Sequence, residues 1–374
     1  MIRLICLSAL VTIIMTGCND HSNSNDSIFN GKISWVDDTC KVEKVTLKEI
    51  DLDGAFYGIP TVCDSIMIFW NYKLTKSFFN IFNLNTGEYI GDFCNKGGGP
   101  EDAYSLPYVY QVYKGNGTIT TLLYASNEQK LFIWNISKSI EQRTTVFDTV
   151  IPYERSLSHD RIANYLYMFR LDKDTLAVNI NSELLSIAGD IASTPYYWKR
   201  TIYSNQQVRE YKIYNNDVIR KEKSHITPDF FYLSRDCIKP DRTKIVQGMH
   251  RLCQINIIDL ASGQVTGCRI KNTPDFSIFN KDMKNIKYYT RTQADDNYIY
   301  AMYLGEETDN HPSVKPKCPH LVYIFDWDGN LIKKLDLGHP VIEFAIDGNN
   351  NLLYSMDAEE DKLYCLDLNQ LNLK

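Results

Sequence analysis

The chain has 374 residues and a formal net charge of −6, with 44% hydrophobic and 23% charged residues. This composition is ordinary for a folded globular protein and provides enough apolar residues for a sizeable core. A net negative chain without a sustained run of Lys and Arg lacks the basic face that binds nucleic acid, so nucleic acid is excluded as a partner.

The first 17 residues have the pattern of a secretory signal: one early positive charge, at Arg3, then an apolar run from Leu4 to Met15. The run has about a dozen residues, whereas a spanning helix needs roughly 20. The end of the run, Met15-Thr16-Gly17-Cys18, resembles the bacterial lipobox. That resemblance implies cleavage before Cys18 and lipid on its thiol and on the new amino terminus.

The polar segment behind Cys18 lacks the apolar residues of a core, and it predicts a flexible leash over residues 18–35. Residues 36–374 are then expected to form one domain. An acylated Cys18 makes the lipid bilayer a partner. It also predicts a location in the bacterial cell envelope, on the periplasmic side of a membrane or at the cell surface.

The body of the chain shows many short runs of β-branched and aromatic residues bounded by turns, which predict an all-β fold. One pattern recurs: a short β run ends in Asn or Asp, and a turn and a second β run follow. The Asn and Asp positions that end these runs are Asn83, Asn135, Asn215, Asp259, Asp326 and Asp367, of which the copy at Asn215 is degenerate. Sheets repeated at roughly 40 to 50 residues indicate a β-propeller.

Six copies predict a six-bladed propeller with blades of four antiparallel strands, and the uneven spacing leaves seven blades as an alternative. The last copy lies close to the C-terminus and supplies too few strands for a blade. The alternating segment from Val42 to Leu52 is expected to complete that blade and so to close the ring.

A glycine-rich loop, Lys96-Gly97-Gly98-Gly99-Pro100-Glu101, is the candidate ligand-face loop. It lacks the Gly-Lys-Ser/Thr ending and the following helix of a phosphate-binding P-loop. A turn between blades that needs positive φ at its glycines is the alternative interpretation.

The remaining candidates for chemistry point to structural roles. Eight cysteines remain beyond Cys18, without a C-x-x-C pair, and they are expected to be mostly buried free thiols. Two aspartate-rich turns, at 51–54 and 326–330, lack the final Glu of a calcium loop. Cys318 and His320, with His311 upstream, match no established zinc spacing and lie in a long loop over 305–319 that is expected to cover one end of the ring. We therefore expect no metal, no cofactor and no catalytic residue.

Several stretches resemble the TolB-like six-bladed propeller lipoproteins of Bacteroidetes: Asn297–Tyr303, Val322–Asn330, Phe344–Asp347, Leu353–Met356, and Gly91–Phe93 with the loop that follows it. The match is clearest over about the last 90 residues. The resemblance implies the fold and an exported, lipid-anchored protein, and it carries over no catalytic residue.

The function that these patterns favour is a non-enzymatic binding or scaffold module for a protein, a peptide or a glycan of the envelope. The alternative is a hydrolase or lyase that acts on polysaccharide with a site in the central funnel. A cluster of ionisable side chains at that funnel would favour the enzyme.

Overall fold

The computed structural model describes residues 28–153, 157–158, 161–162, 164–181, 197–215, 232–277, 285–308, 315 and 317–373. The predicted signal segment, Cys18 and the leash up to residue 27 lie outside these residues, as does His311. In the described part of the chain, no helix has both the length and the apolar content needed to cross a membrane.

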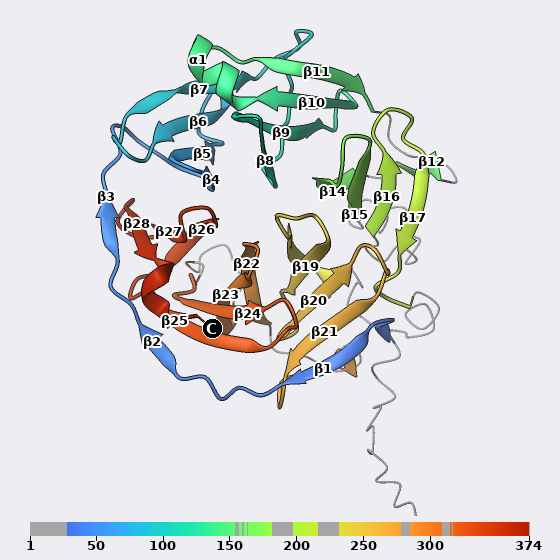
Figure 1. Cartoon of the computed structure of the whole chain (residues 1–374), viewed down its shortest axis with the longest axis vertical. Coiled ribbons are helices and arrows are strands. Elements are labelled where there is room, and N and C mark those ends of the chain that lie inside the picture. The colour runs from blue at the N-terminus through green and yellow to red at the C-terminus, as the bar shows by residue number, and fades with distance from the viewer. Residues whose placement is uncertain are drawn as a thin grey trace, which may run out of the picture.

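The short β runs form six blades of four antiparallel strands arranged around a central axis, and two of these sheets gain a fifth, parallel strand at the outer edge. This arrangement confirms the six-bladed propeller and excludes seven blades (Figure 1). Blades 1 to 3 use consecutive strands, from the innermost outward: β4 (Ile59–Cys63), β5 (Ile66–Trp70), β6 (Ser77–Asn83) and β7 (Tyr89–Asn95); β8 (Val112–Gly115), β9 (Thr118–Ala125), β10 (Lys130–Asn135) and β11 (Phe147–Pro152); β14 (Asn164–Arg170), β15 (Thr175–Asn181), β16 (Tyr197–Thr201) and β17 (Gln207–Tyr211).

Blades 4 to 6 follow in the same way: β18 (Ser234–Ile238), β19 (Lys244–Met249), β20 (Gln254–Asp259) and β21 (Val265–Ile270); β22 (Ile286–Ala294), β23 (Tyr298–Glu307), β24 (Leu321–Asp326) and β25 (Leu331–Asp336); β26 (Val341–Asp347), β27 (Leu352–Asp357), β28 (Leu363–Asp367) and the N-terminal β3 (Lys48–Ile50). Outside the blades lie the helix α1 (Ile136–Gln142), the hairpin β12 (Leu157–Ser158) and β13 (Arg161–Ile162), and a final 3-10 turn, Leu368–Leu371.

The recurrent Asn or Asp of the sequence ends the third strand of a blade in five of its six copies. Its side chain accepts backbone N–H groups of the following turn: the Asp259 carboxylate accepts from Ser262 N at 2.7 Å, and that of Asp326 accepts from Asn330 N at 2.8 Å. The prediction of a copy at Asn215 is wrong, because Asn215 does not end the third strand of a blade. The third strand of blade 3 ends at Thr201, whose hydroxyl accepts from Gln206 N at 2.9 Å.

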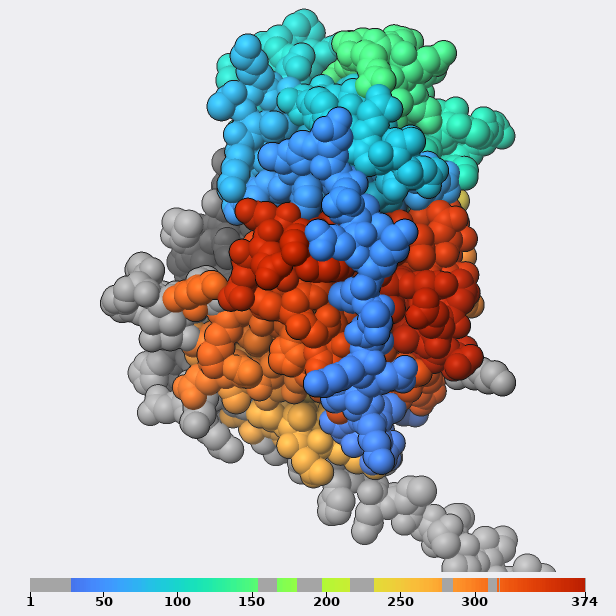
Figure 2. All heavy atoms as spheres, turned by 90° about the vertical axis from the view of Figure 1, so that its left-hand side faces the viewer, coloured from blue at the N-terminus to red at the C-terminus, as the bar shows by residue number. Residues whose placement is uncertain are grey.

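The segment before blade 1 forms a strap along the outside of the ring, which we define as residues 28–52 (Figure 2). Its first strand, β1 (Lys32–Val36), pairs in parallel with β21 of blade 4, and β2 (Val42–Lys44) pairs in parallel with β25 of blade 5. Then β3 pairs antiparallel with β28 and completes blade 6. The predicted ring closure is therefore correct for 48–50, while 42–44 serves the preceding blade.

The strap also corrects the predicted start of the domain at residue 36. Ile28 and Phe29 are 4% and 5% exposed and belong to the apolar cluster between blades 3 and 4. Because burial of these side chains stabilises contact with the ring, residues 28–35 belong to the propeller rather than to the leash.

The core consists of six apolar clusters, one in each interface between neighbouring blades. Trp134 is the largest fully buried side chain; it packs on Phe79 of blade 1 with ring centroids 5.0 Å apart, and its Nε1 donates to Ser139 Oγ at 3.0 Å. The eight described cysteines are all free, and five of them are buried, as expected.

Candidate functional site

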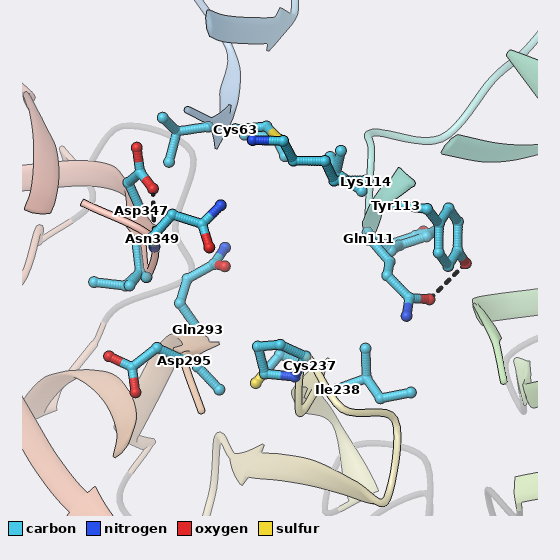
Figure 3. Close-up of a pocket in the computed structure, with 18 of the residues that line it drawn as sticks. Cys63, Gln111, Tyr113, Lys114, Cys237, Ile238, Gln293, Asp295, Asp347 and Asn349 are labelled. Carbon is cyan, nitrogen blue, oxygen red and sulfur yellow. Dashed lines mark hydrogen bonds between the residues drawn. The ribbon is translucent and has the colours of Figure 1, made fainter. Parts of the chain in front are cut away.

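The innermost strands surround a funnel of about 460 Å³. Its walls come from β4, β8, β18, β22 and β26, the innermost strands of five different blades, and from the turns in which these strands end (Figure 3). The funnel therefore opens at the end of the ring at which the innermost strands finish. Residues far apart in the chain meet there because each blade contributes one short segment.

Amide side chains stand in the middle of the funnel. Gln293 of blade 5 and Asn349 of blade 6 point into the opening from adjacent walls (Figure 3). Asn349 Nδ2 donates to Asp64 Oδ1 at 3.1 Å. Gln111, on the opposite wall, accepts from the Tyr113 hydroxyl at 2.6 Å and from Arg170 N at 3.0 Å. Its carbonyl oxygen is therefore occupied by hydrogen bonds within the wall.

Most carboxylates of the funnel are engaged in turns or in one ion pair, and Asp296, an exposed residue of the rim, is the exception among the described residues. Asp295 accepts from Asn297 N and from the Tyr300 hydroxyl, both at 2.7 Å. Asp347 accepts from Asn349 N at 3.2 Å. Lys114 Nζ lies 2.6 Å from Asp64 Oδ2, and this contact lowers the pKa of the Asp64 carboxyl. These oxygens hold the rim in shape.

Two thiols face the funnel, from Cys63 and Cys237. Burial raises the pKa of Cys63 to about 11 and that of Cys237 to about 12. Both are therefore neutral thiols near pH 7, whereas a nucleophile or a metal ligand needs the thiolate. In the described residues, no group of three or more His, Cys, Asp or Glu side chains could hold a metal ion.

A layer of ionisable side chains, which we call the floor, lies on the innermost strands before the residues that line the funnel: Arg291 precedes Gln293 on β22, and Glu343 precedes Asp347 on β26. Arg291 Nε lies 3.3 Å from Glu343 Oε2, and the Arg291 guanidinium lies 4.5 Å from the ring centre of Tyr108. The Tyr108 ring in turn contacts Tyr110, with centroids 4.3 Å apart. Burial raises the pKa of Glu343, and Arg291 partly offsets this shift. The sequence had no signal for this layer, because its members are single residues of separate strands.

The predicted ligand-face loop, Lys96 to Glu101, lies between the end of β7 and the start of β8. Strand direction alternates within a blade, so this loop lies at the end of the ring opposite the funnel. A Cβ atom on Gly97 or Gly99 would lie 2.8 or 2.6 Å from Asp102 Oδ2. Gly97 and Gly99 leave room for the Asp102 side chain, and none of the three glycines has the positive φ that the alternative interpretation, a turn between blades, required.

The other candidate loops are turns or connections where they are described. The aspartate-rich segment 326–330 is the hairpin turn between β24 and β25, with Gly329 at positive φ. The segment 51–54 is not a hairpin turn, because it connects β3 of blade 6 to β4 of blade 1, with Gly54 at positive φ. The long loop after β23 begins at the same end of the ring as Lys96–Glu101, and its residues 309–314 and 316 lie outside the described residues. The Cys318 side chain is half-buried, without a metal-ligand cluster around it in the described part of the chain.

Structural comparison supports the fold. The chain resembles a member of the DUF4221 family from Bacteroides vulgatus, with 12% identity, a TM-score of 0.51, and coverage of 87% of this chain and 96% of that one. It also resembles a protein from Bacteroides fragilis described as exported, with 10% identity, a TM-score of 0.50 and coverage of 87% and 88%. No curated protein sequence matches the chain.

Sequence comparison assigns the family. A model of the TolB-like 6-blade propeller-like family matches residues 41–349, which is most of the chain. The matched region begins in the strap just before β2 and ends in the funnel turn of blade 6. The protein therefore belongs to the TolB-like 6-blade propeller-like family.

Proposed function

We propose that this protein is a binding module of the cell envelope, anchored through acylated Cys18, and that its funnel takes a neutral, hydrogen-bonding segment of a glycan or a peptide. The observation that carries the proposal is the composition of the funnel. The Asp295 and Asp347 carboxylates bind their own turns, the two thiols are neutral, and the Gln293 amide has no hydrogen-bond partner among the described residues.

Amide and hydroxyl groups suit such a ligand. A glutamine side chain donates through its NH₂ group and accepts through its carbonyl oxygen, so it pairs with sugar hydroxyls and with peptide groups alike. Small polar groups placed in a concave site fix the orientation of a ligand. The volume of about 460 Å³ lies within the usual range of ligand pockets, roughly 300–1,000 Å³.

A polysaccharide hydrolase or lyase is the second function that the sequence left open. Asp295 and Asp347 of the walls are engaged in their turns, which leaves Asp296 at the rim and Glu343 of the floor. Canonical glycosidases need two carboxyl groups that face each other across the bond to be cleaved. Glu343 is the carboxylate of the floor among the described residues, and it is paired with Arg291. The geometry therefore favours binding over hydrolysis.

Replacement of Gln293 by leucine is expected to weaken ligand capture on the order of tenfold. Leucine has a similar volume but lacks the hydrogen-bond donor and acceptor of the amide. The measurement is a pull-down of labelled envelope glycans and envelope proteins with the tagged full chain. The matched control is Gln264→Leu, since Gln264 is exposed on the outer hairpin of blade 4 and should leave capture unchanged. Equal capture by wild type and Gln293→Leu contradicts a ligand site in the funnel. Cleavage of a captured glycan would show that the protein is an enzyme rather than a binding module.

The anchor is supported by the lipobox-like end of the signal segment and by the polar residues that follow it. The description of one structural neighbour as exported points in the same direction. We expect Cys18→Ala to move the protein from the membrane fraction to the soluble fraction without unfolding it. Fractionation and palmitate labelling measure this, and Cys6→Ala, within the removed signal, is the control. A Cys18→Ala chain that still takes up label at the membrane would refute the anchor.

A further inference from the structure

A cationic group gathers at the end of the ring opposite the funnel, between blades 4 and 5. It consists of Arg235 near the start of β18, His250 and Arg251 just after β19, and Lys287 near the start of β22. Backbone hydrogen bonds tie these segments together: His250 N donates to Leu233 O at 2.9 Å, and Tyr288 N donates to His250 O at 2.8 Å.

The two blades approach closely at this point. Thr292 Oγ1 of blade 5 donates to the Arg235 carbonyl of blade 4 at 2.6 Å. Gly248 lies opposite Arg235 in the sheet, and a Cβ atom there would clash with the Thr292 side chain. Because the backbones are this close, the cationic side chains of the two blades share one small region.

Lys287 is poorly compensated by the acidic residues that the structure describes around it. Burial lowers the pKa of Lys287, and Arg251 and Arg235 lower it further. Lys287 forms no ion pair with a described residue, and Glu306, which lies across from it in the sheet, pairs instead with Lys317 at 2.7 Å. Glu343, which acts on Arg235, already pairs with Arg291. Like charges gathered in this way repel each other.

His250 adds a second, independent observation. Its side chain is 6% exposed, and neither ring nitrogen has a hydrogen-bond partner. Burial, with Arg235, Arg251 and Lys287, lowers the pKa of His250 to about 3, so the ring is neutral near pH 7. A neutral imidazole still carries one N–H donor. Buried polar groups normally have partners, so an unsatisfied ring among cations indicates a missing acceptor.

We propose that Arg235, His250 and Lys287 bind an oxyanionic group, a carboxylate or a phosphate, at this end of the ring. Such a group would relieve the repulsion between the cations and accept the imidazole N–H. Hydrogen bonds between ionised partners are the strong ones, and a planar guanidinium matches the oxygens of both groups. Arg235 also acts on Glu343 of the floor, but Lys287 and His250 do not line the funnel, so a test at Lys287 is independent of the neutral ligand proposed there.

The test uses the full chain, with sodium phosphate or sodium acetate titrated against sodium chloride at constant ionic strength. We expect at least one of the two anions to raise Tm above the chloride value. Lys287→Gln should weaken the apparent affinity on the order of tenfold, and Lys287→Arg should restore most of it. Lys271→Gln is the matched control, because Lys271 Nζ pairs with Asp37 at 2.7 Å on the outside of the ring.

The arms of the titration identify the group that is bound. A response to phosphate alone assigns a phosphate site, and a response to acetate assigns a carboxylate site. Lys287 is partly exposed, so its variants should keep the Tm that wild type has in chloride. The proposal is overturned if neither anion stabilises the chain more than chloride does, or if Lys287→Gln responds as strongly as wild type.

Discussion

Replacement of both Leu47 and Ile50 by aspartate is expected to lower the free energy of unfolding by about 4 kcal/mol. Leu47 packs against the cluster between blades 5 and 6, and Ile50 packs against the cluster between blades 6 and 1. The two side chains therefore stabilise both interfaces of the blade that closes the ring. Their loss also removes the apolar contacts that keep β3 paired with β28.

Chemical denaturation followed by circular dichroism measures this effect. The matched control is the double variant Val42→Asp and Ile342→Asp, in which the replaced side chains are 48% and 44% exposed. Surface substitutions of this kind usually change stability by less than about 0.5 kcal/mol each. If both double variants lose the same stability, the strap does not close the ring through these contacts.

Trp134→Ala is expected to cost about 4 kcal/mol, because truncation of a fully buried aromatic side chain removes its packing and leaves a cavity. Trp134 is 0% exposed and contacts Phe79 and Phe93 of blade 1, so the cavity would open between blades 1 and 2. The change also leaves the Ser139 hydroxyl, which is 0% exposed, without its indole donor.

Thermal and denaturant unfolding monitored by circular dichroism suit this variant, since tryptophan fluorescence changes with the substitution itself. Trp35→Ala is the control: Trp35 is 44% exposed on β1, and its main partner is the Arg269 guanidinium, 5.5 Å from the ring centre. We expect a loss of about 1 kcal/mol or less there. Comparable losses at Trp35 and Trp134 would show that burial between the blades is not the source of the stability.

The blade pattern could be predicted from sequence because its signal is local. An Asn or Asp at the end of a third strand accepts N–H groups two to four residues later, as Asp326 does, and such a turn needs no distant partner. The third strand of blade 3 was not predicted, because it ends at Thr201, which accepts the N–H of its turn with a hydroxyl instead of a carboxylate or an amide. The Asn215 copy has the sequence pattern but does not end a third strand.

The closing segment was predicted only in part for the same reason. Alternation over 42–52 indicates β structure, but it does not show which blade each part of the segment joins. Val42 pairs with Lys334 in parallel, and Ile50 pairs with Leu363 antiparallel. Both choices depend on partners at the far end of the chain.

The funnel could not be predicted, because a residue becomes part of it only when its strand is known to be innermost. Gln293 and Asn349 belong to different blades and have no shared motif. The composition of the glycine-rich loop suggested a ligand-face loop, although Gly97 and Gly99 leave room for the Asp102 side chain. The cationic end could not be predicted for the same reason as the funnel, since Arg235 and Lys287 lie on different blades and share no motif.

The strap has a consequence for how the chain reaches its native state. During synthesis β1, β2 and β3 leave the ribosome before the other described strands, but their partners β21, β25 and β28 are made more than 200 residues later. Contacts between such distant segments make folding slow, because the entropy of closing a very large loop is lost before they form. The strap strands therefore stay without their partners during most of synthesis, and the ring cannot close until β28 has been made and can pair with β3.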